Sequence, residues 1–161
     1  MDFRITGLSP ELFAALVGLD DLELASRGAR RVVAEPGRGF PDRIELREAD
    51  PGESLLLVNY LHLPAATPYR SSHAIYVLES ACQRYDRINE VPALFRPRVM
   101  SVRAFDQDDM MIDADITPGT DVERLIERLL ADPRTAYLHA HYAKYGCLAA
   151  HIARVELGAH A

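Results

Sequence analysis

The chain has 161 residues, a net charge of −6, 48% hydrophobic residues and 26% charged residues, which is ordinary for one globular domain. This composition excludes disorder of the whole chain, and the lack of a Lys/Arg-rich block argues against nucleic-acid binding. The longest apolar run, 55–58, is far shorter than the roughly 20 residues that cross a bilayer, so we expect no membrane segment. Two cysteines and an N-terminus without a signal-peptide pattern predict a cytoplasmic protein.

The N-terminal half is predicted to combine short helices with strands. Helices are expected over 9–18, which begins with Ser-Pro, and over 20–28, where Asp20 and Glu23 form a capping box. Alternating or continuous apolar runs predict the strands. The expected strands are 2–6, 31–35, 43–47, 55–63 and 72–79.

The C-terminal half is predicted to contain two hairpins and the longest helix. This helix covers 120–131, with Thr120 and Glu123 as a capping box and an apolar stripe at helical spacing. The other expected elements are a helical turn over 92–95 and strands over 99–105, 111–116, 135–142 and 147–156.

An acidic turn, 106–109, joins the first of these hairpins. Asp113 and Asp115 are expected to share a strand face with Arg103, so an ion pair across the strands is the favoured interpretation of these acids. A calcium site is the less favoured one, because the ligand spacing of an EF-hand loop is absent.

Strands joined by short turns favour antiparallel pairing, and three helices are too few for a doubly wound fold. The sequence therefore predicts a single α+β domain over residues 1–161. Its expected architecture is a curved, mostly antiparallel sheet or open barrel, with about three helices packed on one side.

The last hairpin carries the side chains best suited to chemistry. Alternation along the strand places Tyr137, His139 and His141 on one face, and a register that pairs His141 with Cys147 would add a thiol. His139 and His141 are candidate metal ligands, and the third ligand would be Cys147 or a distant histidine. The candidates for that distant ligand are His62 and His73.

The same hairpin also fits a thiol-based enzyme. In that hypothesis Cys147 is the catalytic nucleophile and His141 is its base. The competing structural interpretation is that the histidines are solvated or hydrogen-bonded and that Cys147 is a small buried apolar residue.

A loop leading into a strand, 67–73, is the candidate ligand-binding segment. Arg70, Ser72 and His73 offer hydrogen-bond donors that suit a carboxylate or phosphate. The alternative is an ordinary turn whose serines bond to the local backbone. If this loop lies over the last hairpin, the two candidate patches form one site.

Several segments resemble the bacterial family called Domain of Unknown Function 1203. The matching stretches are 28–33, 67–75, 103–106, 113–115, 136–141 and 146–147. The resemblance implies a small bacterial cytoplasmic protein and no known activity, so it assigns no catalytic or binding residue. The cofactor is left open as unknown, since Gly-rich phosphate loops and Cys-x-x-Cys pairs are absent.

Three functions therefore stay open at the level of sequence. The favoured one is a domain that binds a small molecule, for which an anionic ligand is preferred, with enzymatic activity left open. The alternatives are a metal-dependent or thiol-based enzyme on the His139, His141 and Cys147 face, and a protein–protein interaction module. The chain is expected to be a monomer or a homodimer.

Overall fold

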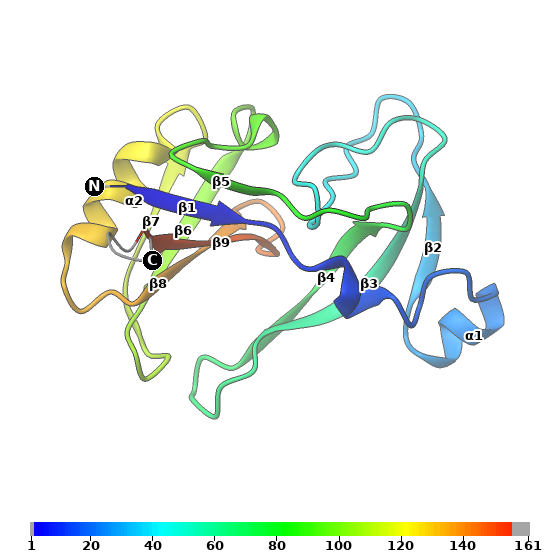
Figure 1. Cartoon of the computed structure of the whole chain (residues 1–161), viewed down its shortest axis with the longest axis horizontal. Helices are drawn as coiled ribbons and strands as arrows, with labels where there is room; N and C mark the ends of the chain where they lie inside the picture. Colours follow the sequence, from blue (N-terminus) through cyan, green and yellow to red (C-terminus); the bar gives the residue numbers. More distant parts are fainter. Residues whose placement is uncertain (1, 156–161) are drawn as a thin grey trace, which may run out of the picture.

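The computed structural model describes residues 2–155, whose strands form two separate sheets (Figure 1). The strands are β1 (Phe3–Thr6), β2 (Arg30–Val33), β3 (Ser54–Leu63), β4 (Ser71–Leu78), β5 (Asp86–Ile88), β6 (Val99–Phe105), β7 (Met111–Pro118), β8 (Tyr137–Tyr142) and β9 (Leu148–Arg154). Six of them form one sheet in the order β5-β1-β9-β8-β6-β7, and the other three form a sheet in the order β2-β3-β4.

The strand pairs are antiparallel as predicted, but the single curved sheet or open barrel was wrong. The large sheet is open, because β5 and β7 each have one neighbour and stand at its edges. The hairpins β3–β4, β6–β7 and β8–β9 follow from local turns. The partition into two sheets follows from β1, which pairs with β5 and β9, strands that are distant in sequence.

The expected set of about three helices on one side was also wrong. In the described part, the long helix α2 (Val122–Ala131) packs on the large sheet, whereas the short α1 (Asp21–Ser26) lies beside β2 of the small sheet (Figure 1). The helix expected over 9–18 is reduced to a 3-10 turn, η1 (Pro10–Phe13). A second turn, η2 (Ala93–Phe95), was predicted correctly. Neither α-helix has the length and apolarity needed to cross a bilayer.

The two predicted capping boxes had different outcomes. At α1, Asp20 accepts a hydrogen bond from the Glu23 amide at 2.8 Å and donates its own amide to the Glu23 carboxylate at 3.0 Å, as predicted. At α2 the N-cap is Asp121 and no side chain caps it. The carboxylate of Glu123 binds Arg96 instead, at 2.9 Å, because that guanidinium lies within its reach.

The strand expected over 43–47 was wrong, although the segment is buried. Its alternating pattern reflects a loop that folds into the protein interior, where Arg43 and Asp42 are both buried. Arg43 Nε donates to the Leu148 carbonyl at 2.8 Å, and Asp42 accepts the amide of Leu78 at 2.8 Å. These bonds to other elements replace the ladder that a strand would form.

The large sheet has two different faces. Arg128 of α2 binds Asp113 at 3.1 Å and Asp115 at 2.9 Å, so this face of β7 lies toward the helix. The predicted ion pair of these acids with Arg103 was wrong. A register shift between Ala104 and Phe105 places Arg103 opposite Ala114, and a one-residue shift exchanges the faces. Arg103 therefore lies on the face away from α2.

Candidate functional site

Histidines from both sheets gather where the sheets approach each other. The ring centroids of His62 on β3 and His139 on β8 are 5.6 Å apart, and those of His62 and His141 are 5.1 Å apart. His73 on β4 stacks on His62 at 5.5 Å, and His151 on β9 lies 5.8 Å from His139. These five residues, the histidine cluster, are all the histidines in the described part of the chain.

Irregularities in strand pairing direct two of these rings toward the cluster. The pairing of β3 with β4 shifts between Leu61 and Leu63, so His62 is the extra residue of a bulge. The pairing of β8 with β9 shifts between Ala140 and His141, where Ala149 of β9 is the extra residue. A bulge bends its strand and changes the direction of the neighbouring side chain. One bulge therefore contains a histidine of the cluster, and the other lies opposite His141.

The turn after β8 fixes the proton position on His141. Gly146 has a φ of +77°, a left-handed conformation that glycine adopts readily, and its carbonyl lies 2.9 Å from His141 Nδ1. A carbonyl accepts hydrogen bonds, so Nδ1 carries the proton of the neutral ring. His141 Nε2 therefore presents a lone pair, and it is buried without a hydrogen-bond partner among the described residues.

Other ring nitrogens of the histidine cluster are also buried without a hydrogen-bond partner. The Nδ1 atoms of His62, His73 and His139 are buried, and residues 2–155 supply none of them with a hydrogen-bond partner. His62, His139 and His141 retain only 8%, 5% and 0% of their surface exposed. Unsatisfied buried polar atoms are rare in native proteins, so a concentration of them at one place marks a position where a polar ligand would find hydrogen-bond partners.

The buried imidazoles are held neutral. Burial is the main cause, and it lowers the pKa of His62 to about 4, that of His139 to about 2 and that of His141 to about 3. Repulsion from Arg103 and from neighbouring rings acts in the same direction on all three. At neutral pH each ring thus offers one N–H donor and one lone pair.

Arg103 is the cation nearest to the cluster. It lies on β6 directly opposite His139, and such cross-strand neighbours have Cβ atoms about 4.5–5.5 Å apart. Its side chain is half-buried, and burial lowers the pKa of the guanidinium. None of the ion pairs found within residues 2–155 includes Arg103.

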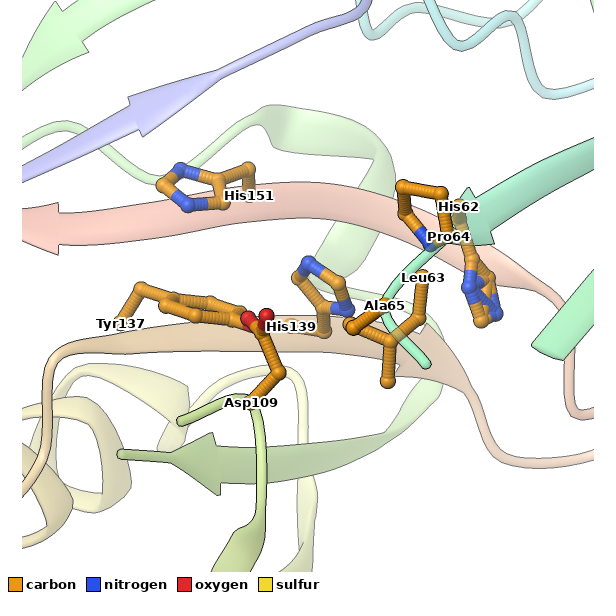
Figure 2. A pocket seen from close by; sticks show the side chains of 8 residues that line it. All are labelled: His62, Leu63, Pro64, Ala65, Asp109, Tyr137, His139 and His151. Atoms are coloured by element: carbon orange, nitrogen blue, oxygen red, sulfur yellow. The ribbon is translucent and has the colours of Figure 1, made fainter. Parts of the chain in front are cut away.

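A pocket of about 370 Å³ opens beside the histidine cluster (Figure 2). It is lined by His62, Leu63, Pro64, Ala65, Asp109, Tyr137, His139 and His151. Asp109 and Tyr137 stand at one end, where the Tyr137 hydroxyl donates to Asp109 Oδ1 at 2.6 Å. His62 stands at the other end, with His139 between them (Figure 2).

The loop after β3 connects the two candidate patches. Thr67 Oγ1 lies 3.4 Å from the Asp109 carbonyl, and the Tyr69 ring packs edge-on against Phe105 with centroids 6.4 Å apart. The loop therefore rests on the β6–β7 hairpin and forms part of the pocket wall. The structure thus brings this segment and the last hairpin together around one cavity.

The three predicted ligand-binding residues do not lie together in the structure. His73 belongs to the histidine cluster, whereas Arg70 and Ser72 are exposed and are not among the pocket-lining residues. The Arg70 guanidinium binds the Pro64 carbonyl and so holds the loop together. Ser71, next to them, places its hydroxyl 3.4 Å from His62 Nε2.

The predicted thiol pair is not formed in the described structure. Cys147 Sγ lies 3.0 Å from an N–H group of Arg43, while His141 bonds to Gly146 instead. The hairpin register differs from the one assumed, because Leu148 lies opposite His141 and the extra residue Ala149 then places His151 opposite His139.

The predicted metal ligands His139 and His141 are neighbours, with ring centroids 6.2 Å apart. As the side chains stand, no three or more His, Cys, Asp or Glu residues within 2–155 are grouped so that they could hold a metal ion. The proposed third ligands, His62 and His73, are nevertheless part of the same cluster.

Sequence reasoning missed Arg103 as a neighbour of the histidine cluster and Asp109 as a pocket residue. Arg103 was assigned to an ion pair because the bulge in β6–β7 leaves no clear mark in the sequence. Asp109 has a φ of +59°, which signals a special backbone position, but this became visible only in the structure. No signal in the sequence predicts that β3 and β8, which lie in different sheets, bring His62 against His139.

Comparison with known proteins agrees with the resemblance seen in the sequence. Neither a curated protein nor a solved structure matches the chain. The model of a family described as "Protein of unknown function (DUF1203)" matches residues 39–154, which include every residue of the pocket and of the histidine cluster. Since this match covers well over half of the chain, the protein belongs to the DUF1203 family.

Proposed function

We propose that this chain binds a small anionic molecule in the pocket between its two sheets. The observation that carries the proposal is Arg103, a half-buried cation without a carboxylate partner among the described residues, opposite the pocket residue His139, whose Nδ1 has no partner there either. A guanidinium withdrawn from water needs a hydrogen-bonding counter-charge. An anion beside Arg103 supplies one and also gives the imidazole N–H groups an acceptor.

The same electrostatics favour binding over acid–base catalysis. A general base works best when its pKa is near the operating pH. The pKa values of His139 and His141, about 2 and about 3, are far below neutrality. These rings therefore serve as hydrogen-bonding groups, and a bound anion would raise their pKa values.

The test is a thermal melt in the presence of phosphate, sulfate, acetate and citrate. A ligand at about 100 times its Kd adds about 2.7 kcal/mol to the free energy of unfolding. For a chain of this size, that raises Tm by about 5–10 °C. We expect at least one of these anions to raise Tm, and Arg103→Gln to remove the rise.

The matched control is Arg124→Gln. Arg124 is an exposed arginine of α2, which packs on the face of the large sheet opposite to Arg103, so this variant should keep the full rise in Tm. The proposal is wrong if none of the anions changes Tm, or if the rise survives in Arg103→Gln.

A second candidate, transition-metal binding, is favoured by one specific observation. Metal-bound histidines commonly donate their other ring N–H to a backbone carbonyl, and His141 has this arrangement with Gly146. His62, His73 and His139 would be the further ligands after ring rotations. We place this candidate second because a metal cation beside Arg103 would be repelled.

Elemental analysis of untagged protein, purified without chelator, tests this candidate. About one equivalent of zinc or copper per chain, lost in the double variant His139→Ala, His141→Ala, would support it. Metal well below one equivalent, with no uptake after zinc is added, would exclude it. A folded far-UV spectrum of the double variant is the required control.

A further inference from the structure

Groups of opposite charge lie at different places around the pocket. Arg103 lies on β6 opposite the pocket residue His139, outside the pocket lining, and is among the charges that lower the pKa of His62, His139 and His141. Asp109 and Asp106 are the charges that raise the pKa of Tyr137, after burial and the hydrogen bond from its hydroxyl to Asp109. Tyr137 and His139 both line the pocket and are two residues apart on β8, a separation of about 7 Å along a strand.

Asp109 is the carboxylate at the acidic end of the pocket. Asp106, in the same turn, uses Oδ1 to accept the amides of Asp108 and Met110, both at 2.9 Å, so it is part of the turn itself. Asp109 instead lines the pocket and accepts the Tyr137 hydroxyl through Oδ1. No ion pair within the described range includes Asp109, so its second oxygen is available to a ligand.

The backbone holds Asp109 in this position at some cost. Its φ of +59° lies in the left-handed region, which aspartate and asparagine tolerate better than most side chains. The Thr67 hydroxyl lies 3.4 Å from its carbonyl, which links the turn to the pocket loop. Residues kept in uncommon conformations are concentrated at functional sites.

The wall between the two ends is apolar. Leu63, Pro64 and Ala65 line the pocket from the end of β3 and the following loop. A pocket of about 370 Å³ lies at the lower end of the range for small-molecule sites, which is about 300–1,000 Å³. The pocket therefore suits a short molecule with an apolar middle and polar ends.

We infer that the ligand is a zwitterionic amino carboxylate, with its carboxylate beside Arg103 and the imidazoles and its protonated amine beside Asp109. Its short carbon chain lies against Leu63, Pro64 and Ala65. This inference rests on the proposed function and adds the cationic group at the opposite end. An anion without such a group leaves Asp109 without a counter-charge, so it binds less tightly.

The experiment compares 5-aminopentanoate, pentanoate and pentylamine by isothermal titration calorimetry. The three share one carbon chain and differ only in their end groups. We expect 5-aminopentanoate to bind at least about 10-fold more tightly than either of the others, since a hydrogen bond to a charged group is worth about 1.5–3 kcal/mol. Asp109→Asn should abolish this preference by weakening the binding of 5-aminopentanoate.

Asparagine suits this test because it also tolerates the left-handed backbone of the turn. The matched control is Asp108→Asn. Asp108 is an exposed acid of the same turn and is not among the pocket-lining residues, so this variant should keep the preference.

Equal affinities for 5-aminopentanoate and pentanoate would overturn the inference and leave anion binding standing. Binding of phosphate or sulfate, without binding of 5-aminopentanoate, would have the same two consequences. If neither these compounds nor simple anions bind, both proposals fail.

Discussion

Lowering the pH from 6.5 to 5 is expected to destabilise the folded chain by about 2 kcal/mol for each fully buried imidazole. An unfolded histidine has a pKa of about 6.5 and takes up a proton in this range. The folded pKa values of His62, His139 and His141, about 4, 2 and 3, keep these rings neutral. The unfolded state then binds more protons, so the stability present above pH 6.5 is lost as the pH falls.

Urea denaturation at several pH values between 5 and 7 measures this dependence. The variant His139→Phe removes one titrating ring beside Phe105 and Tyr137, and should reduce the slope of stability against pH by up to about 1.4 kcal/mol per unit. Glu53→Gln is the control. The pKa of Glu53 is lowered to about 2, chiefly by Arg47, so this acid is ionised throughout the range. An unchanged slope in His139→Phe would contradict the assignment of a neutral buried ring.

Replacing Arg43 by Met is expected to reduce the free energy of unfolding by about 3–5 kcal/mol. Arg43 is only 2% exposed, and its guanidinium binds the Pro41 and Leu148 carbonyls and Cys147 Sγ. It also lies over the Tyr142 ring, at 4.9 Å. Methionine would fill much of the space but leave buried carbonyl groups unpaired, which is costly.

Chemical denaturation of Arg43→Met and Arg43→Lys separates charge from geometry. Lysine keeps the positive charge but lacks the planar guanidinium with which arginine donates to several acceptors at once, so we expect an intermediate loss of stability. Arg134→Met is the surface control, because its partner Asp132 lies two residues away and the arginine side chain is 72% exposed. Such pairs contribute about 0–1 kcal/mol. A loss below about 1 kcal/mol in Arg43→Met would show that this buried guanidinium has no structural role.

Local patterns in the sequence predicted most individual elements. The apolar stripe of α2 and the strands β3, β4 and β6 lie within a few residues of their predicted positions. The exceptions lie where a distant partner overrides the local preference. The segment around Arg43 alternates like a strand, yet its guanidinium bonds to β9, more than 100 residues away. The short strand β5 was missed because its pairing with β1 defines it.

The candidate site was likewise predicted in part, where local patterns were enough, and missed where a distant partner was needed. Strand alternation placed His139 and His141 on one face, because side chains two residues apart share a face whichever strand is the partner. The unusual loop sequence around Arg70 directed attention to His73, which the structure places in the histidine cluster, whereas Arg70 itself binds the Pro64 carbonyl of the loop. The pairing of His141 with Cys147 required a register, and the structure places Leu148 opposite His141 instead.

The sequence by itself determined the α+β character, the antiparallel hairpins and the location of the histidines on strands, because these depend on side-chain periodicity and turn chemistry. The division into two sheets, the meeting of His62 with His139 and the position of Arg103 were decided only by the tertiary structure. The reason is physical. A single-residue bulge exchanges the faces of a strand, and contact between strands of different sheets depends on packing of the whole core, which local patterns do not encode.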